Sequence, residues 1–345
     1  MSKNHQKIPV LVAGIGGASL GTEIVKALVL AGRYAVYGCD ISPHAYGHYM
    51  EGPEQTFLAD PGDYVASIAR MCRENGIRYV IPGGEQPLAL LAGNREALGA
   101  SGAVLAANSG RVMRLFRNKF EGLSLIRDKG FPVPAMAAPR SPDELDDMPM
   151  PCVVKPSEGS GGSDAVFLAN DLAEARLYVT YLLRNAKSPI VQRFIPETEG
   201  EFTVGVLHLP DGRLAGSIAM QRSFHSKLSV RDRTRVGIIS SGYSQGTIAD
   251  FPEVRKAAEA IATAVGSVGP LNVQGRMKDG VFYPFEINPR FSATTYLRAL
   301  AGFNEVDFLL QFLETGDCPL PGPIREGYYL RSLCETFVPP SDLKR

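Results

Sequence analysis

The sequence has no excess of charge of either sign. Its 36 lysine and arginine residues balance 36 aspartate and glutamate residues. Proteins whose main partner is a nucleic acid or an anionic membrane surface usually carry a basic excess. The balance therefore argues against both kinds of partner, while it leaves room for a local basic pocket.

Cysteines are also few, and several familiar motifs are missing. The five cysteines are scattered without a Cys-x-x-Cys pair, which argues against a disulfide framework and a zinc site. The N-terminal region lacks the long apolar run of a signal peptide or a membrane span. No Walker-type loop and no Ser-His-Asp or Cys-His arrangement stands out. We therefore expect a cytoplasmic protein without a nucleophilic side chain at its site.

The composition that is present is typical of a globular protein. Hydrophobic residues make up 45% and charged residues 21% of the 345 residues, which suggests two or three domains. In the first third, short apolar runs alternate with helical spacing, which predicts a parallel sheet with right-handed crossovers. The expected strands cover residues 10–13, 36–40, 79–82 and 103–106, and the expected helices cover 20–31 and 64–74.

A glycine-rich loop, residues 14–21, follows the first expected strand. It has three interpretations: a dinucleotide fingerprint with Asp40 on a ribose, a tight turn, or an anionic substrate group at the helix N-terminus beside Gly16 and Gly17. Because the glycine spacing fits a dinucleotide fingerprint imperfectly, the turn and the anion site rank above a nicotinamide cofactor.

Glu85 follows the expected strand 79–82. Ligands of open parallel sheets bind beyond the carboxyl ends of the strands, so Glu85 is a candidate contact for a substrate amine. An equal alternative is a carboxylate that the helix dipole favours at the start of a helix.

The remaining two thirds alternate strands and helices around a proline-rich break at 130–151. The expected helices are 115–129, 172–184, 254–265 and 303–314, and the expected strands are 152–156, 189–194, 201–209, 214–220 and 329–337. Lys155 lies near the end of the first of these strands and shortly before a Gly/Ser-rich loop, whose free N–H groups suit phosphates. The alternative for that loop is a plain surface hairpin.

A hairpin expected at residues 271–291 carries candidate oxygen ligands for a metal ion. Residues 271–276 and 283–291 read as strands around Asp279-Gly280. A three-residue loop would place Gln274 opposite Pro284, on the face of Glu286 and Asn288, whereas a two-residue loop would place it on the other face. We therefore expect the longer loop and a Mg²⁺ site. Arg290 suits a phosphate. The alternative is a half-buried hairpin with polar groups toward water.

The sequence contains, in this order, two lysines, a glycine flap, a linker strand, an acidic residue and this hairpin. This order of motifs resembles that of the ATP-grasp family and is closest to its carbamoyl-phosphate-synthase-like branch. The resemblance covers residues 10–314. It implies an α/β fold in which a parallel-sheet domain (1–113) precedes a nucleotide clamp of two antiparallel sheets. The clamp would comprise a linker helix and lid (114–200) and a C-terminal part (201–345).

The resemblance also implies a role for each matching position. The implied contacts are Lys119 near the α-phosphate, Lys155 on the phosphates, Gly159, Ser160, Gly161 and Gly162 in a mobile flap, Gln192, Arg193, Phe194 and Ile195 beside adenine, Glu201 on the ribose, Gln274, Glu286 and Asn288 on the metal, and Arg290 beside the transferred phosphate. Lys155 and Arg290 form the expected catalytic pair. The candidate substrate contacts are Gly16, Gly17, Glu85 and Arg276.

The activity that the resemblance implies is ATP-dependent ligation of a small carboxylate to an amine through an acyl phosphate, with ADP released. ATP and Mg²⁺, or Mn²⁺ in its place, are the expected cofactors, and a homodimer is the expected alternative to a monomer. Competing readings are an enzyme that phosphorylates bicarbonate or carbamate, a regulatory nucleotide-binding module without turnover, and a nicotinamide oxidoreductase.

Overall fold

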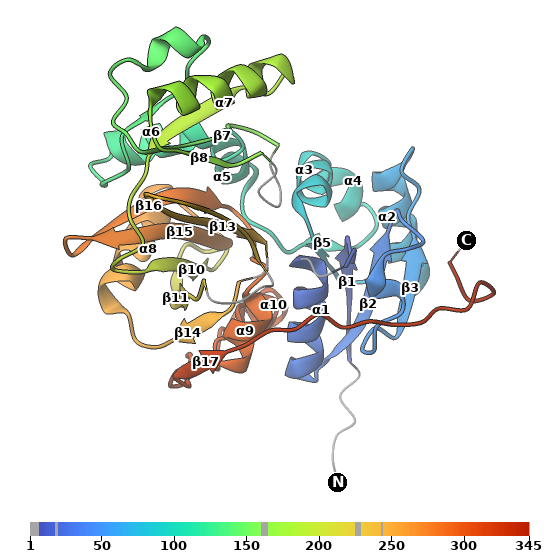
Figure 1. Ribbon diagram of the computed structural model, residues 1–345. Helices are drawn as coiled ribbons and strands as arrows, with labels where there is room; N and C mark the ends of the chain where they lie inside the picture. The colour runs from blue at the N-terminus through green and yellow to red at the C-terminus, as the bar shows by residue number, and fades with distance from the viewer. Residues whose placement is uncertain (1–6, 18–19, 160–164, 225–228, 243, 345) are drawn as a thin grey trace.

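A computed structural model describes residues 7–17, 20–159, 165–224, 229–242 and 244–344 (Figure 1). Within these ranges it contains one parallel sheet of five strands and antiparallel sheets of six, four and two strands. Among the described residues, no helix combines the length and the apolar composition that crossing a bilayer requires.

The N-terminal part is a parallel sheet with helices on both faces, as predicted. Its strand order is β3-β2-β1-β4-β5. Side chains alternate between faces along each strand, so Val10 and Val12 pack under α1 while Leu11 and Ala13 pack under α2. The elements are β1 (Ile8–Ala13), α1 (Leu20–Ala31), β2 (Tyr34–Asp40), β3 (Gln55–Leu58), α2 (Tyr64–Asn75), β4 (Tyr79–Pro82), α3 (Glu85–Gly93), α4 (Arg95–Gly99) and β5 (Val104–Leu105).

Two short helices, not one, lead out of this part. The predicted helix 115–129 is divided between α5 (Gly110–Leu115) and α6 (Lys119–Asp128). The side chain of Ser109 caps α5, and the side chain of Asn118 accepts from the amides of Phe120 and Glu121 at the start of α6. An asparagine cap starts a new helix because it satisfies amides that would otherwise lack partners. The prediction of one continuous helix was therefore wrong.

The middle part is a four-stranded antiparallel sheet, which we call the lid sheet. It is covered on one face by α7 (Leu172–Arg184), whose residues Ala175, Val179 and Leu182 pack on Val154 and Val191. The strand order is β6 (Met136–Ala137), β9 (Pro189–Arg193), β7 (Cys152–Pro156) and β8 (Phe167–Ala169).

The last part is a six-stranded antiparallel sheet, which we call the large sheet. Helix α8 (Pro252–Ala264) covers one face, and α9 (Thr295–Leu300) and α10 (Glu305–Thr315) lie against the other. The strand order is β16 (Val281–Asn288), β15 (Pro270–Lys278), β10 (Glu201–His208), β11 (Leu214–Arg222), β14 (Gly246–Ile248) and β17 (Gly327–Tyr329). The two-stranded sheet pairs β12 (Ser229–Thr234) with β13 (Gly237–Gly242).

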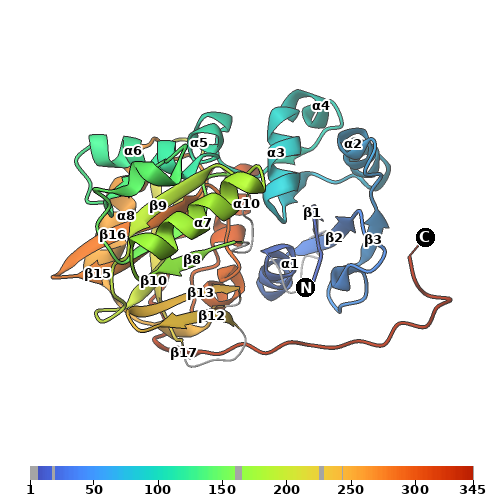
Figure 2. The ribbon, with the colours of Figure 1, turned by 45° about the horizontal axis from the view of Figure 1, so that its top comes forward.

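The predicted final strand, residues 329–337, is wrong apart from its first residue. Strand β17 ends at Tyr329 because its partner β14 offers only Gly246–Ile248 for pairing. The chain then leaves the sheet and runs past α1 toward β3, as both ribbon views show (Figures 1 and 2). At its end, Lys344 donates to the Thr56 carbonyl oxygen on β3.

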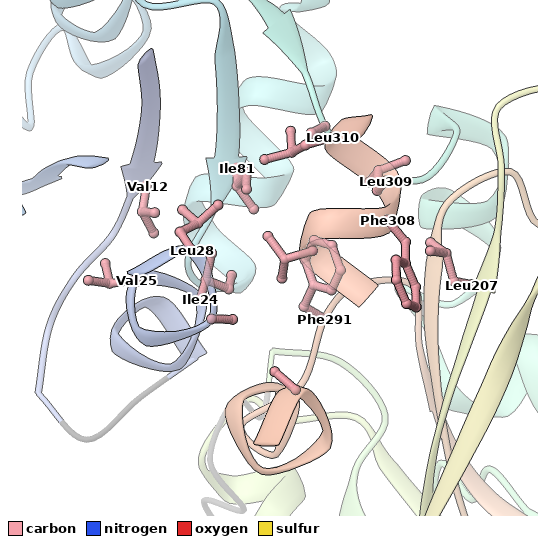
Figure 3. Close-up of a cluster of buried hydrophobic side chains, with 14 of the residues drawn as sticks. Val12, Ile24, Val25, Leu28, Ile81, Leu207, Phe291, Phe308, Leu309 and Leu310 are labelled. Atoms are coloured by element: carbon pink, nitrogen blue, oxygen red, sulfur yellow. The ribbon is translucent and has the colours of Figure 1, made fainter. Parts of the chain in front are cut away.

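One hydrophobic core joins the N-terminal sheet to the large sheet (Figure 3). Ile24 and Leu28 on α1 lie on the side of Phe291, whereas Phe308 on α10 lies beside Leu207 of the large sheet. Each Å² of apolar surface that this core removes from water contributes roughly 25 cal/mol to the free energy of folding. The N-terminal sheet therefore has a fixed position beside the hairpin of β15 and β16.

Candidate functional site

The lid sheet and the large sheet enclose a cavity. It is lined by side chains of both sheets and of the segment that joins them, namely Pro134, Val153, Lys155, Val166, Gln192, Arg193, Phe194, Ile195, Glu201, Arg222, Ile239, Gln274, Arg276, Phe285 and Glu286. Eight of these fifteen positions were singled out from the sequence as nucleotide or metal contacts. The cavity thus brings together residues such as Lys155 and Phe285, which lie 130 positions apart along the chain.

The hairpin of β15 and β16 places Gln274 beside Glu286, as expected, but its loop is shorter than predicted. Its loop has two residues, Asp279 and Gly280, both at positive φ (52° and 71°), because Lys278 pairs with Val281. These angles are typical of the tight turn that suits twisted strands. The prediction of a three-residue loop was therefore wrong.

A β-bulge compensates for the shorter loop. Gly275 pairs with Pro284 but Gln274 pairs with Glu286, so Phe285 is an extra residue in β16. An extra residue in one strand reverses the face of every side chain beyond it. Gln274 therefore lies beside Glu286 after all. Asn288 also lies on this side, since its side-chain amide donates to a Glu286 oxygen at 3.2 Å.

Lys155 crosses from the lid sheet to the bulge. Its ammonium donates to the carbonyl oxygen of Phe285 at 3.1 Å and lies 5.5 Å from the centre of the Phe285 ring. The side chain is buried. Burial lowers the pKa of Lys155 from its ordinary value of 10.5 to about 8, although the charge of Glu286 acts in the opposite direction.

Glu286 is the carboxylate at the centre of this charge group. Burial is the largest single influence and would raise its pKa, whereas the nearby charges of Lys155 and Lys119 lower it. The hydrogen bond from Asn288 and the charge of Arg290 act in the same direction, and the pKa is lowered overall. Glu286 is therefore ionised at neutral pH and is a suitable oxygen ligand for a divalent cation.

Glu201 lines the cavity with both oxygens already paired. Arg222 on β11 donates to one oxygen, and Arg276 on β15 donates to the other at 2.8 Å. Arg276 also donates to the Ile195 carbonyl oxygen at 2.6 Å and lies 4.8 Å from the Phe194 ring centre. Arg276 therefore forms part of this cavity wall, although the sequence had placed it among the substrate contacts.

The segment that joins the two sheets offers an unused donor at each end. The amides of Arg193 and Phe194 donate to the carbonyl oxygens of Ala135 and Pro151. Within the described ranges, the Ile195 amide has no such partner. The buried side-chain amide nitrogen of Gln192 also has no partner there. Unpaired buried donors are costly, so both point to a ligand with acceptor atoms.

Lys119 and the glycine loop lie around the end of β7. Lys119 is the first residue of α6, and its amide donates to the Ser157 carbonyl oxygen at 2.8 Å. Gly159 is exposed at φ 68°. The flap residues Ser160, Gly161 and Gly162 lie outside the described residues, so their predicted role stays a prediction.

The glycine loop after β1 has the features of a tight turn. The two oxygens of Asp40 accept from the amides of Ile15 and Ser42. Gly14 has a φ of 101°, and a Cβ at Gly21 would lie 1.8 Å from the Gly14 carbonyl oxygen. The turn interpretation thus accounts for Asp40 without a ribose. Gly16 and Gly17 are half-buried, and their role toward a substrate stays a prediction.

Glu85 and Arg290 meet at the junction of the N-terminal sheet and the hairpin. Glu85 is the first residue of α3, and one of its oxygens lies 2.9 Å from an Arg290 guanidinium nitrogen. Arg290 also donates to the Phe291 carbonyl oxygen at 3.0 Å. The sequence identified both residues but assigned them to different groups, so their pairing is a finding of the structure.

A buried network behind the hairpin was missed from the sequence. Arg298 on α9 is fully buried and donates to the Asn272 side-chain oxygen at 2.6 Å and to Thr203 at 3.0 Å. Its other nitrogen lies 3.3 Å from Glu305. Asn272 pairs with Asn288 across the hairpin. The pattern of Arg298 and Glu305, seven residues apart near two short helices, gave no signal of this network.

Comparison with known proteins agrees with this geometry. The profile of a protein family described as "ATP-grasp domain" matches residues 116–294, which include the lid sheet and every strand of the large sheet except β17. The chain belongs to the ATP-grasp family. The predicted resemblance to this family is therefore confirmed.

Curated relatives are carbamoyl phosphate synthase large chains. The large chain of Mycobacterium sp. (strain JLS) is 30% identical over 241 residues, covering 67% of this chain and 20% of the relative. That of Mycobacterium tuberculosis (strain ATCC 25618 / H37Rv) is 58% identical over 45 residues, covering 13% of this chain and 4% of the relative. The chain thus spans about a fifth of the length of the curated relatives it matches.

Solved structures share the fold at low sequence identity. An L-amino acid ligase from Bacillus licheniformis has a TM-score of 0.65 and 18% identity, covering 90% of this chain and 74% of that chain. An N5-carboxyaminoimidazole ribonucleotide synthetase from Thermus thermophilus has a TM-score of 0.67 and 16% identity, covering 92% and 81%. A biotin carboxylase from Campylobacter jejuni has a TM-score of 0.66 and 13% identity, covering 95% and 75%.

Proposed function

We propose that the protein is an ATP-dependent carboxylate–amine ligase for small metabolites. The observation that carries the proposal is one cavity between the two clamp sheets. It combines a buried lysine (Lys155), an ionised carboxylate (Glu286) and unpaired donors (Gln192 and Ile195). We place a parallel α/β domain in residues 1–113, the linker helix and lid of the nucleotide clamp in residues 114–200, and the C-terminal part of the clamp in residues 201–345.

The two ends of the cavity suit the two ends of ATP. The amide nitrogens of Gln192 and Ile195 are donors for the ring nitrogens of adenine. Phe194 and Arg276 form a wall on which the base or the sugar packs, with Glu201 beside the ribose. Lys155 and Lys119 lie at the other end, toward Glu286, where positive charge stabilises phosphate oxygens.

The oxygen atoms of Gln274, Glu286 and Asn288 would hold Mg²⁺. An ionised carboxylate with two amide oxygens fits a cation that takes hard ligands and keeps water or phosphate in its other positions. A bound Mg²⁺ supplies charge neutralisation on the phosphates of the nucleotide.

The reaction follows from the charges of the chain itself. A carboxylate oxygen attacks the γ-phosphorus, the bond to the β-phosphate oxygen breaks, and an acyl phosphate and ADP form. Lys155 and Arg290 stabilise the charge that is transferred. The amine nitrogen then attacks the acyl carbon, phosphate leaves, and the nitrogen loses one proton. Water would hydrolyse the acyl phosphate, so the lid sheet must close over it.

The cavity is too narrow for a nucleotide in its present form. Its space is about 90 Å³, whereas pockets for small ligands usually span about 300–1,000 Å³. Lys155 closes it by bonding the Phe285 carbonyl oxygen across the two sheets. We infer that the lid sheet opens to admit ATP and that Lys155 exchanges this carbonyl oxygen for a phosphate oxygen.

The second substrate would bind at the junction of Glu85 and Arg290. Glu85 lies beyond the carboxyl end of β4, where its carboxylate suits an ammonium group. Once Arg290 breaks its ion pair with Glu85, its guanidinium is available to the acyl phosphate. The two residues therefore link the amine side of the reaction to the phosphate side.

A second candidate is phosphorylation of bicarbonate or carbamate. The observation that favours it is the 30% identity to the carbamoyl phosphate synthase large chain of Mycobacterium sp. (strain JLS). This chain corresponds to about a fifth of that protein. The candidate reaction is therefore only the formation of a carboxy phosphate or a carbamoyl phosphate by one nucleotide clamp, and not the whole reaction of that protein.

The experiment that separates the candidates is ADP release from MgATP over a matrix of amino acids and small carboxylates, with and without bicarbonate, followed by product mass. The ligase predicts ADP only when a carboxylate and an amine are both present, and a product at the sum of their masses minus water. ADP release with bicarbonate alone would support the second candidate. ATP binding without turnover in any mixture would contradict both.

A further inference from the structure

A second cavity lies at the other end of β11, away from the nucleotide cavity. It has a volume of about 500 Å³, within the usual range for a site that binds a small molecule. Ser217 lines it, whereas Arg222 on the same strand lines the nucleotide cavity. Five residues of strand span about 17 Å, so the two cavities are separate.

One wall of this cavity is apolar and fixed in place. Phe303, between α9 and α10, is buried, and Pro321 and Ile324 lie on the segment that passes over it. A Cβ at Gly216 would lie 2.9 Å from the Phe303 ring, so glycine at this position lets the wall approach β11. The amide of Arg325 donates to the Ala301 carbonyl oxygen at 2.8 Å and anchors the segment.

The opposite wall carries both signs of charge in a connected set. Arg255 on α8 donates to Ser217 at 3.1 Å through one nitrogen and to Asp250 at 2.9 Å through a second. One oxygen of Glu326 accepts from the Asp250 amide at 3.0 Å. The guanidinium is therefore held in one orientation by partners on two elements.

Each of these charged groups keeps one atom unused. Among the described residues, the third nitrogen of Arg255 has no hydrogen-bond partner, and neither has the second oxygen of Asp250 or of Glu326. The cavity thus offers an unused cationic donor and unused anionic acceptors beside an apolar wall. A ligand that uses both kinds of group needs an acceptor for Arg255 and a donor for the carboxylates, and a carboxylate with an ammonium supplies both with full charge complementarity.

We propose that this cavity binds an α-amino acid, with its carboxylate on Arg255, its ammonium between Asp250 and Glu326, and its side chain against Phe303 and Ile324. An amine without a carboxylate would leave the Arg255 nitrogen unpaired, and a carboxylic acid without an amine would leave the two carboxylates unpaired. The proposal does not depend on the reaction at the nucleotide cavity, since none of these side chains lines that cavity.

The test is titration calorimetry of the full chain with L-leucine, and with its two truncated analogues, 4-methylpentanoic acid and 3-methylbutylamine. We expect saturable binding of L-leucine and about tenfold weaker binding of each analogue. The variant Arg255→Gln should weaken L-leucine binding by tenfold or more. The matched control is Arg213→Gln, whose arginine pairs with Asp211 outside the cavity and should bind as the unaltered protein does.

A further variant makes the result decisive. Ile324→Trp fills the cavity and should abolish binding, with thermal unfolding used to verify that Arg255→Gln and Ile324→Trp both remain folded. Either of two results overturns the proposal: no saturable binding of L-leucine to the unaltered protein, or unchanged binding in folded Arg255→Gln and Ile324→Trp.

Discussion

The nucleotide cavity and the junction at Glu85 use the same kinds of charged side chain in different surroundings. At the cavity, Glu201 and Arg276 are both buried and are bonded to each other. At the junction, Arg290 meets Glu85 across an ion pair in which the carboxylate side chain is 42% exposed. Buried, bonded charges are rigid, whereas exposed ion pairs contribute little and rearrange easily. The difference suggests that the end of the cavity around Glu201 and Arg276 is fixed and that the acceptor side adapts to its substrate.

The largest expected effect is at the carboxylate of the cavity. Glu286→Ala should lower MgATP-dependent ADP release by about 100-fold or more, because it removes the only charged oxygen ligand of the proposed metal site. Glu199→Ala is the matched control, since Glu199 binds the turn amides at the far end of the same hairpin. Turnover within a few-fold of normal in Glu286→Ala would contradict the metal site.

A second effect follows from the lowered pKa of Lys155. Burial lowers this pKa to about 8, so the phosphate-binding charge is present below that value and is lost as the pH rises through it. Nucleotide affinity, measured by calorimetry from pH 7 to 9.5, should fall by about tenfold at pH 9. Lys155→Arg keeps its charge and should bind independently of pH. A parallel pH dependence in both proteins would show that another group titrates.

The stability of the free protein should change with pH in the direction opposite to that of its nucleotide affinity. Between about 8 and the ordinary value of 10.5, the unfolded state binds a proton at Lys155 that the folded state does not. This residue therefore makes the folded state more stable as the pH rises through that window. The two slopes differ in sign, so affinity and unfolding measurements on the same protein separate them.

The junction should respond in binding more than in stability. Glu85→Gln should raise the KM for the amine by about tenfold, since it removes the proposed ammonium contact, while the free energy of unfolding changes by no more than about 1 kcal/mol. Steady-state kinetics and urea unfolding measure the two. An unchanged KM would mean that Glu85 only holds Arg290, and that the comparison between the two regions must be redrawn.

The smallest expected effect is at the turn of the hairpin. Gly280 has a φ of 71°, which a residue with a Cβ adopts at a cost, so Gly280→Ala should lower stability by about 1 kcal/mol. Asp279→Asn should change it by less than about 0.5 kcal/mol because asparagine also suits this turn. Equal effects of the two substitutions in urea unfolding would contradict the two-residue turn.

Much of the fold could be predicted from periodicity. The parallel sheet, the helix α7 and the hairpins follow from alternating and helical patterns that leave little choice of structure. The helix break at Asn118 and the end of β17 could not be predicted in this way. The helix break depends on a side-chain cap at Asn118, and the end of β17 depends on the short length of its partner strand β14.

Many residues of the site could be predicted from the sequence, but the contacts between them could not. Gln274 and Glu286 were expected on one face for the wrong reason, because a bulge at Phe285 leaves no pattern in the sequence. The pairing of Glu201 with Arg222 and Arg276 also joins three strands. Such contacts depend on tertiary packing, which one sequence does not encode in any local spacing.

The central claim is that a substrate carboxylate becomes an acyl phosphate. The most direct test uses the carboxylate that the ADP-release matrix identifies, labelled with ¹⁸O at both oxygens, with MgATP and the amine. The mechanism predicts inorganic phosphate that carries one ¹⁸O atom, since the carboxylate oxygen that attacks the γ-phosphorus leaves with it. Unlabelled inorganic phosphate formed together with the amide product would contradict it.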